Sequence, residues 1–251
     1  MKDYKTLIGL TMMCCMLAVL AIPFQAQGDT AVSSITTKLD LPYVSKYVWR
    51  GLVANPDPAF QPSLTFTHKS GASLNLWASL DATDVNREQG HPTEIDYTGN
   101  YAWTLGKLGM NAGLIDYTFP NTAFASTKEV YASASLSSFL SPTLSVNYDY
   151  DQADGYYASL SGSYSTPMAS TSATFSARVS YATSNYNKLY FRVPQSAFTD
   201  LLLSASVPFT VGKSMTITPA LSYSTILDSS LRDAVTDPDN FFTSLTASFA
   251  F

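Results

Sequence analysis

Cysteine is nearly absent from this chain, and charged side chains are scarce. Both cysteines, Cys14 and Cys15, lie close to the N-terminus, so the rest of the chain offers no disulfide, no zinc thiolate site and no cysteine nucleophile. Charged residues make up 13% of the sequence, compared with roughly 25% in an average soluble domain. So low a charge is typical either of a polar but uncharged soluble protein or of a protein whose outer surface contacts lipid.

An excess of basic residues is also missing. The chain has 14 Lys and Arg against 19 Asp and Glu, which excludes nucleic-acid binding because that function needs a basic face. No glycine-rich phosphate loop and no metal-ligand spacing occur, so we predict neither a cofactor nor a metal site. No long apolar helix follows the N-terminal segment, which excludes a helical inner-membrane protein.

The N-terminal segment is typical of a secretory signal peptide over residues 1–28. Lys2 and Lys5 give it a positive start, residues 7–22 form its apolar core, and Ala26-Gln27-Gly28 provides the small residues that signal peptidase accepts. The alternative is a retained membrane anchor, but the apolar run is shorter than the roughly 20 residues of a spanning helix. The rest of the chain, residues 29–251, is then the mature domain.

The last residues of the chain alternate between two kinds of side chain. Successive side chains of a strand point to opposite faces, and here one face is apolar except for Thr243, while the other is small and mostly polar. This pattern is typical of a membrane-spanning β-strand, and it recurs along nearly the whole chain. The apolar row consists of Phe241, Leu245, Ala247, Phe249 and Phe251. We expect the barrel assembly machinery to recognise Phe251.

The repeated pattern predicts twelve strands, an even number as expected for a bacterial single-chain barrel. Short connections with Gly, Pro or Ser alternate with mostly longer ones. This sorting matches periplasmic turns at one end of a barrel and extracellular loops at the other. The strands are expected near residues 34–47, 59–69, 72–82, 94–104, 108–117, 128–139, 143–151, 155–166, 172–184, 198–211, 214–226 and 240–251.

The apolar rows carry no charge in the strands where the two faces separate most clearly. A soluble β-sandwich would show the same alternation with its apolar face turned inward, so periodicity alone leaves both folds open. The leader, the sorted loops and the terminal Phe favour an all-β, transmembrane antiparallel barrel of about twelve strands. Aromatic residues at the ends of the rows are expected at the membrane interfaces: Tyr43, Tyr47, Trp49, Tyr97, Tyr101, Trp103, Tyr150 and Tyr181.

Two sets of residues fit this pattern poorly. The first is Pro62, Pro208 and Pro219. Each removes a ladder hydrogen bond from a predicted strand, which indicates either a bulge or a position outside the hydrocarbon zone. The second set is Trp77, Leu202 and Phe242, which fall on the polar face. They either fill the lumen or indicate an error in the register.

Ordered blocks of sequence between residues 43 and 165 resemble a known family. The blocks are YVSKYVWRGL (43–52), PAFQPSL (58–64), SGASLNLWAS (70–79), EIDYTGNY (94–101), DYTFP (116–120), EVYAS (129–133) and LSP (140–142). In order and spacing they resemble the TorF family, an uncharacterised group of Gram-negative outer-membrane proteins proposed to be porins. The resemblance implies an outer-membrane barrel and a pore. It supplies no catalytic residues and no substrate.

Ionisable side chains on the polar face are the candidate pore lining. Seven acids stand against two bases there, and a ring of carboxylates prefers cations. We therefore predict a modestly cation-preferring channel for small polar solutes. The alternative is that ion pairs fill a closed lumen, with each base satisfying two acids. The candidate residues are Lys38, Asp40, Asp81, Glu94, Asp96, Glu129, Asp149, Arg178 and Asp200.

Arg50 and Gly51 head the first long loop and are the candidate pore mouth. We expect a positive φ at Gly51. Arg50 either clasps lumen carboxylates or is an exposed loop cation. The histidines offer little for an outer-membrane hydrolase, because His68 lies beside a short turn and His91 lies alone among loop acids.

The sequence therefore predicts a non-enzymatic porin-like channel for passive diffusion in the outer membrane of a Gram-negative bacterium. Its expected partners are outer-membrane lipids and small polar solutes. The alternative function is a closed structural or adhesive barrel. The acidic loop at 228–239 lacks the ligand spacing of a calcium loop.

Overall fold

The computed structural model describes residues 34–251. The predicted signal peptide at residues 1–28 lies outside the described residues, as do Cys14 and Cys15. Within the described part of the chain, no helix combines the length and the apolar character needed to cross a membrane.

Antiparallel strands make up most of the described chain. The wall segments are β1 (Ile35–Val44), β4 (Ala59–Phe60), β5 (Ser63–His68), β6 (Ala72–Asp81), β7 (Pro92–Leu105), β8 (Leu108–Thr118), β9 (Thr127–Leu136), β10 (Thr143–Asp149), β11 (Gly155–Met168), β12 (Thr171–Ala182), β13 (Ala197–Ser206), β14 (Phe209–Val211), β15 (Met215–Ile226) and β16 (Asp239–Ala250). The other elements are β2 (Tyr47–Trp49), β3 (Leu52–Asn55), α2 (Ser184–Tyr190) and α3 (Ser229–Asp233).

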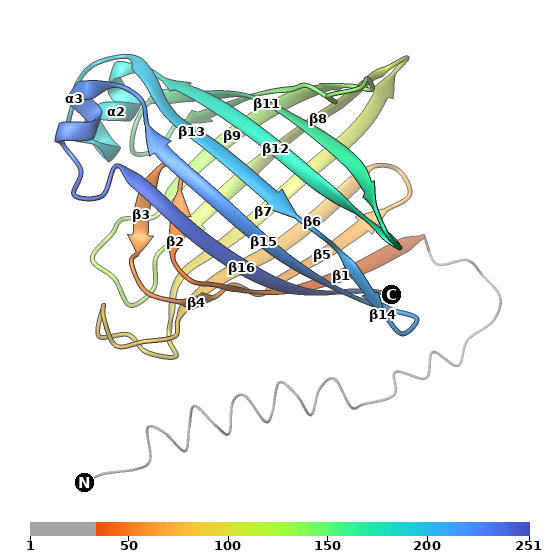
Figure 1. The fold of residues 1–251 in the computed structure, drawn as a ribbon. Helices are drawn as coiled ribbons and strands as arrows, with labels where there is room; N and C mark the ends of the chain where they lie inside the picture. Colours follow the sequence, from red (N-terminus) through yellow and green to blue (C-terminus); the bar gives the residue numbers. More distant parts are fainter. Residues whose placement is uncertain (1–33) are drawn as a thin grey trace, which may run out of the picture. The chain divides into compact units, whose positions relative to one another are not determined.

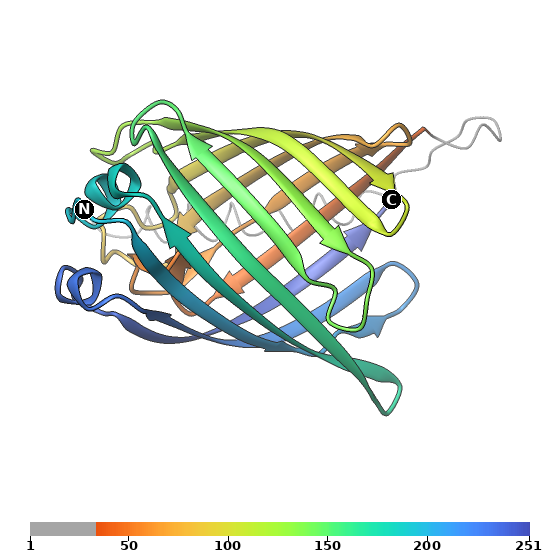
Figure 2. The same cartoon turned by 90° about the horizontal axis from the view of Figure 1, so that it is seen from above.

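The wall segments close into a barrel, as the two views in Figures 1 and 2 show. Each strand pairs with its neighbour in sequence, and β1 pairs with β16, for example at Leu39 and Phe249. Because β5 follows β4 and β14 follows β13 within interrupted strands, the 14 segments form a closed barrel of 12 strands. Closure leaves no unpaired edge in the wall formed by the described strands. The predicted fold class and strand number are confirmed.

The two ends of the barrel differ in their connections (Figure 1). Tight turns join β5 to β6, β7 to β8, β11 to β12 and β14 to β15 at one end, where the backbone of Phe251 also pairs with Thr37. The opposite end carries the long connections, with α2, α3 and the β2–β3 hairpin. The predicted sorting of the loops is therefore confirmed. We call these the short-turn end and the long-loop end.

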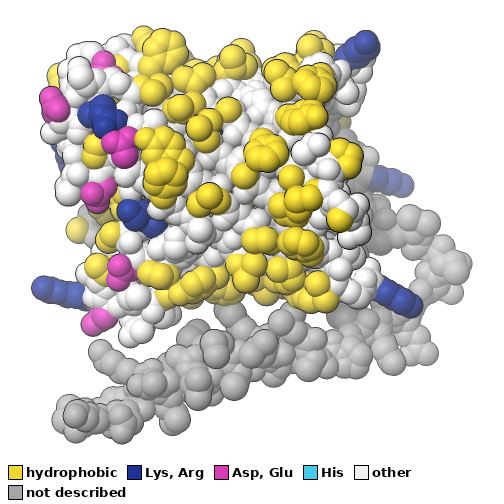
Figure 3. Space-filling model, in the orientation of Figure 1, with side chains coloured by type: hydrophobic (Ala, Val, Ile, Leu, Met, Phe, Trp, Pro, Cys, Tyr) yellow, Lys and Arg dark blue, Asp and Glu magenta, His cyan; other side chains and the backbone are white. Residues whose placement is uncertain are grey.

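The outer wall is apolar and exposed, whereas the inner face carries the polar side chains. Leu114 and Leu144, on the outer rows, are 57% and 54% exposed. Figure 3 shows hydrophobic side chains across the middle of one outer face, with the charged ones near the ends. Such a surface suits contact with lipid, because a charge at the bilayer midplane costs roughly 2–4 kcal/mol.

The prolines interrupt the ladder at two places. Pro62 separates β4 from β5, and Pro208 separates β13 from β14. Pro219 stays within β15, and its carbonyl accepts a hydrogen bond of 3.2 Å from the Val207 amide. Since the N–H and C=O of one strand residue point to the same neighbour, the donor that Pro219 lacks would face the interruption at Pro208. The two prolines thus share one gap in the wall.

The predicted first strand is longer than the observed one. It was expected over residues 34–47, but β1 ends at Val44 and a separate strand, β2, begins at Tyr47. The reason is local: the Ser45 amide donates to the Thr243 carbonyl, and the Ser45 hydroxyl accepts from the Thr243 amide, both at 2.9 Å. After these bonds the chain leaves the wall.

The large apolar residues on the polar face do not indicate an error in register. Trp77 contacts the ring of Tyr47 at 5.6 Å between centroids. Leu202 lies opposite Arg178 on one side. These positions belong to the inner face, as does Phe242, which lies opposite Ser222. Of the two explanations, the structure therefore supports side chains that fill the lumen.

Candidate functional site

The first long connection folds into a hairpin, β2–β3, inside the long-loop end of the barrel. Trp49 pairs with Leu52, which leaves Arg50 and Gly51 as a two-residue turn. Their φ angles are 48° and 84°, and a type I′ turn requires positive φ at both central positions. The positive φ predicted for Gly51 is confirmed. Arg50 itself adopts a left-handed conformation that costs a non-glycine residue about 1–2 kcal/mol.

Arg50 binds Glu129 of β9 through two parallel hydrogen bonds. Its Nη1 and Nη2 each lie 2.7 Å from a carboxylate oxygen of Glu129. The Arg50 side chain is 10% exposed and that of Glu129 is 0% exposed. A bidentate pair of this kind is among the strongest hydrogen-bonded arrangements in proteins. Arg50 therefore clasps a lumen carboxylate and is not an exposed loop cation.

Aromatic side chains surround the same guanidinium group. Nη1 donates to the Tyr186 hydroxyl at 2.6 Å, and Nη2 donates to the Tyr117 hydroxyl at 3.4 Å. The guanidinium carbon lies 4.3 Å from the ring centroid of Tyr157 and 4.5 Å from that of Trp49. Cations within about 6 Å of a ring face gain a favourable electrostatic interaction. The group is thus held by one carboxylate, two hydroxyls and several ring faces.

Arg50 stays protonated and positively charged despite its burial. Burial alone lowers the pKa of the guanidinium, but Tyr186, Tyr117 and Glu129 outweigh it and hold that pKa well above its usual range. Burial also raises the pKa of the Tyr186 hydroxyl well above its usual value. The cluster therefore contains a cationic Arg50 beside neutral Tyr186.

The tip of the hairpin reaches across the interior. A Cβ atom on Gly51 would lie 2.4 Å from Cδ1 of Ile226 and 2.9 Å from Cβ of Asp200. The hairpin starts between β1 and β4, yet its tip contacts β8, β9, β11, β13 and β15. Near its base, Lys46 Nζ donates to Asn240 Oδ1 at 2.8 Å. The hairpin therefore spans the long-loop half of the lumen.

The two helices complete the filling of this half. Tyr186 of α2 packs so closely on β11 that a Cβ atom at Gly155 would lie 2.5 Å from its amide nitrogen. Asp228 caps α3 by accepting from the Leu231 amide, and Leu231 is fully buried beside Ile226. The long-loop half of the described barrel is thus packed with side chains.

The predicted pore residues all lie on the inner face, but in different surroundings. Lys38 Nζ lies 2.9 Å from Asp40 Oδ2, and Arg178 Nη2 lies 3.2 Å from Asp200 Oδ2. Each base therefore pairs with one acid, rather than with the two that the ion-pair alternative supposed. The structure brings Arg50 to this group of residues as an additional cation.

Four of the predicted acids have almost no contact with solvent. Asp149 accepts hydrogen bonds from Thr127, from Tyr190 and from the backbone amides of residues 151–153. The fully or nearly fully buried acids are Asp81, Glu129, Asp149 and Asp200. Their role as pore lining stays a prediction.

Glu94 and Asp96 lie on β7, on the same inner face. Asp96 stands opposite Trp77 on one side and Tyr117 on the other. Within residues 34–251, its Oδ1 atom is buried without a hydrogen-bond partner. An unpaired buried carboxylate oxygen is costly, and among the predicted pore residues only Arg178, through its Nε atom, shares this condition in the described part of the chain.

Several aromatic side chains lie at positions that were not predicted from the sequence. Tyr47 and Trp49 were predicted at a membrane interface, but both lie on the hairpin and face its inner contacts, so that prediction is wrong for them. The other residues of the predicted girdles are exposed on the outer wall: Tyr43, Tyr97, Tyr101, Trp103, Tyr150 and Tyr181. Alternation along β8 and β11 is a signal for the inward Tyr117 and Tyr157. No local pattern indicates Tyr186, which belongs to a loop helix.

The histidines and the acidic loop have local structural contacts. His68 Nδ1 lies 2.8 Å from the Ser70 hydroxyl at the short-turn end. The His91 amide donates to the Glu88 carbonyl within its loop. In the acidic loop, Asp239 pairs with Arg232 at 2.5 Å. Among the described residues, no group of three or more His, Cys, Asp or Glu has an arrangement that would hold a metal ion.

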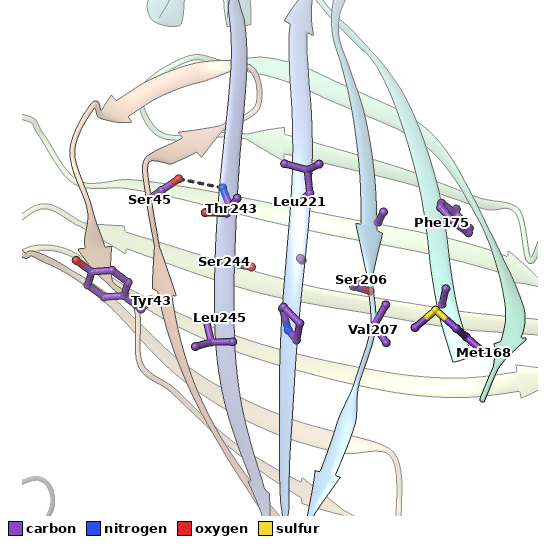
Figure 4. Close-up of a pocket in the computed structure, with 14 residues that line it drawn as sticks. Tyr43, Ser45, Met168, Phe175, Ser206, Val207, Leu221, Thr243, Ser244 and Leu245 are labelled. Carbon is purple, nitrogen blue, oxygen red and sulfur yellow. Dashed lines mark hydrogen bonds between the residues drawn. The ribbon is translucent and has the colours of Figure 1, made fainter. Parts of the chain in front are cut away.

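A hollow of about 590 Å³ lies on the outer wall, away from the inner site (Figure 4). Large apolar side chains such as Phe175 and Leu221 line it together with small residues such as Ala205 and Thr243. It lies over the strands that carry Val207 and Pro219, where the ladder is interrupted. Its apolar lining suits lipid contact and offers no reactive group.

Comparison with known proteins assigns the chain to a family. Residues 28–249 match the family described as "Bacterial protein of unknown function (Gcw_chp)", so the chain belongs to this family. No curated protein matches the chain. The family covers far more of the chain than residues 43–165, on which the resemblance to TorF was based, and the TorF name itself stays a prediction.

The fold is similar to solved outer-membrane channels. The KdgM porin has a TM-score of 0.53 at 9% identity, covering 85% of this chain and 99% of that chain. The NanC porin has 0.52 at 13%, covering 84% and 98%. The "COG4313 outer membrane channel from Pseudomonas putida F1" has 0.51 at 11%, covering 90% and 98%. At these identities the similarity concerns the fold alone.

Proposed function

We propose that the protein is an outer-membrane channel for passive diffusion of small polar solutes, with a preference for cations. The observation that carries this proposal is the charge of the inner face. Seven carboxylates lie there against four cationic side chains, Lys38, Lys46, Arg50 and Arg178. Carboxylates that line a pore raise the local concentration of cations and repel anions.

The proposed location is the outer membrane of a Gram-negative bacterium. The closed barrel, its apolar outer face and its similarity to the KdgM and NanC porins support this location. The same observations favour a channel over an enzyme. The two histidines also lie apart, since His68 is the last residue of β5 at the short-turn end and His91 precedes β7 at the long-loop end.

The proposed charge preference separates this protein from one of its structural neighbours. One structure is described as "KdgM porin in complex with disordered oligogalacturonate". Uronate carboxylates would meet a net negative inner face in the present barrel. We therefore propose that acidic oligosaccharides are poor solutes for this channel.

A second candidate is a closed structural or adhesive barrel. The packed long-loop half favours it, because the β2–β3 hairpin, α2 and α3 fill the interior there. In this case the exposed loops, such as residues 119–126, would carry the function.

Single-channel recording from the folded protein in planar bilayers tests the two candidates. A channel gives discrete current steps and, in a salt gradient, a reversal potential of the sign expected for cations. The absence of steps from protein verified as folded supports the closed barrel.

A matched pair of substitutions tests the acid lining. Asp96→Asn removes an inner acidic group, whereas Asp116→Asn removes one from the outer rim, where Asp116 lies 3.9 Å from Lys128. We expect the reversal potential to move towards zero for Asp96→Asn and to stay unchanged for Asp116→Asn. Asp81→Asn should act in the same direction as Asp96→Asn but more weakly, because Asp81 is 1% exposed and is bound by Asn86 and Thr93. Equal reversal potentials for all variants would contradict the assignment.

A further inference from the structure

The surroundings of Arg50 form a complete site for a guanidinium group. The Trp49 ring that also faces the guanidinium lies on the hairpin, but the other ligands belong to the wall and to α2: Tyr117 on β8, Glu129 on β9, Tyr157 on β11 and Tyr186 on α2. The group that they bind comes from the hairpin, which is a separate element inserted from another part of the chain. Site and occupant are therefore structurally distinct.

We propose that this wall site binds the guanidinium or ammonium group of cationic solutes, and that Arg50 is a tethered occupant that competes with them. The inference deepens the proposed function and rests on it for one point, namely that solutes enter the barrel. It specifies the solute class as small organic cations.

The wall site is organised by contacts that do not involve Arg50. Glu129 accepts from Asn147 Nδ2 at 2.9 Å and from the Tyr117 hydroxyl at 3.2 Å. The Tyr157 hydroxyl donates to Asp200 Oδ1 at 2.8 Å and can accept from the Ser180 hydroxyl, whose oxygen lies 2.7 Å away. These bonds position the carboxylate and the ring before a cation arrives, and such preorganisation increases affinity.

The chemistry of the site selects organic cations over simple metal ions. One carboxylate offers two parallel acceptors to a planar guanidinium, and ring faces attract cations that carry their charge on a weakly hydrated surface. A metal ion would need more oxygen ligands than this site provides.

The hairpin is fastened in a way that permits exchange. The Arg50 side chain is held at Glu129 by an ion pair and hydroxyl contacts, which a free guanidinium can replace, while the Gly51 backbone packs separately on Ile226 and Asp200. The base of the hairpin keeps separate anchors in the Lys46–Asn240 hydrogen bond and the Tyr47–Trp77 contact. A solute that displaces Arg50 therefore leaves the base of the hairpin attached. Displacement would also expose Glu129 and the neighbouring Asp96 to the lumen.

Chemical rescue of an Arg50→Ala variant tests the site. In this variant Glu129 lacks its partner, so methylguanidinium should bind and raise the unfolding temperature of the detergent-folded protein. The double variant Arg50→Ala/Glu129→Gln keeps the cavity but removes the carboxylate charge. We expect the half-maximal methylguanidinium concentration to be at least about tenfold higher in the double variant, because a charge-assisted pair is lost. Sodium chloride and the neutral isostere methylurea serve as controls.

The site can still be tested if the Arg50→Ala variant does not fold by itself. The measured quantity is then the folded yield of Arg50→Ala when it is refolded with methylguanidinium, methylurea or sodium chloride. A yield that rises only with methylguanidinium, and not in the double variant, supports the site. Equal effects of methylguanidinium on both variants, or no effect on either, would overturn it.

Current recordings separate this inference from the proposed function. Methylguanidinium should reduce the single-channel current of Arg50→Ala at concentrations about tenfold lower than for the double variant. Rescue of folding without any current supports the binding site and contradicts the channel. Current without rescue or selective block supports the channel and contradicts the site.

Discussion

The two halves of the barrel interior are built from different chemistry. Towards the long-loop end, carboxylates, tyrosines and Arg50 are buried and bound to one another. Towards the short-turn end, the inner face carries mainly Ser, Thr and Asn, which pair across strands, as Ser204 does with Ser222 at 2.9 Å. Apart from the Lys38–Asp40 pair near the short-turn end, the charged inner side chains are therefore concentrated in the tightly packed long-loop half. Under the proposed function, solute selection would belong to the long-loop half, and the other half would be a polar vestibule.

Removal of the hairpin should have the largest effect on this comparison. Val44 pairs with Ala59, so an Asn-Gly turn can replace residues 45–58 and join the two strands directly. We expect the single-channel current to rise several-fold, because the hairpin crosses the lumen. A matched shortening of the exposed loop at 119–126 should leave the current unchanged. Equal currents from the intact chain and both variants would show that the hairpin does not constrict the lumen.

Loss of the Glu129 carboxylate should have the largest effect on stability. Glu129→Ala leaves Arg50 buried without its ion-pair partner, and breaking a buried pair costs about 3–5 kcal/mol. The neighbouring Lys128 faces outward and lies 3.8 Å or more from its acids, so Lys128→Ala should change stability by less than about 1 kcal/mol. Urea unfolding of both variants in lipid vesicles measures the difference. Similar values for the two would contradict the assigned role of the pair.

Two glycines with positive φ, one at the hairpin tip and one at a short turn, should differ in the stability lost on substitution by alanine. Gly51→Ala combines a left-handed backbone with a contact of 2.4 Å to Ile226, so we expect a loss of about 2–4 kcal/mol from strain and overpacking. Gly106 has φ +63° at a short turn, with nothing within 4 Å of an added Cβ. Gly106→Ala should therefore cost only about 1–2 kcal/mol. Unfolding in urea gives both values, and equal losses would mean that the hairpin tip is not packed on the wall.

Substitutions in the vestibule should have the smallest effect. Ser204→Ala removes the hydroxyl contact with Ser222, and a typical hydrogen bond contributes about 0.5–1.5 kcal/mol. Because no charge changes, the reversal potential should stay that of the unsubstituted protein. A clear shift in ion selectivity would show that the vestibule also selects solutes.

The alternating pattern was sufficient to predict the wall but not its contents. Rows such as Leu74, Leu76 and Leu80 indicated strands and faces because alternation is a local property of an extended backbone. Arg50 and Gly51 were recognisable as a turn in the first long loop. Their destination was not recognisable, because the contact from Arg50 to Glu129 joins residues that are 79 positions apart.

The sequence by itself determined a two-faced, closed antiparallel wall with long loops at one end, since side-chain alternation and turn residues act within a few positions. Only the tertiary structure decided that the hairpin folds inward and that Tyr47 and Trp49 lie inside the barrel rather than at the membrane interface. The same holds for the contact of Tyr186 with the Arg50 guanidinium. The physical reason is that a buried cation must find its carboxylate and ring partners wherever the closed barrel brings them together. These partners lie on separate strands that only the closed barrel brings near Arg50, so no local sequence pattern predicts them.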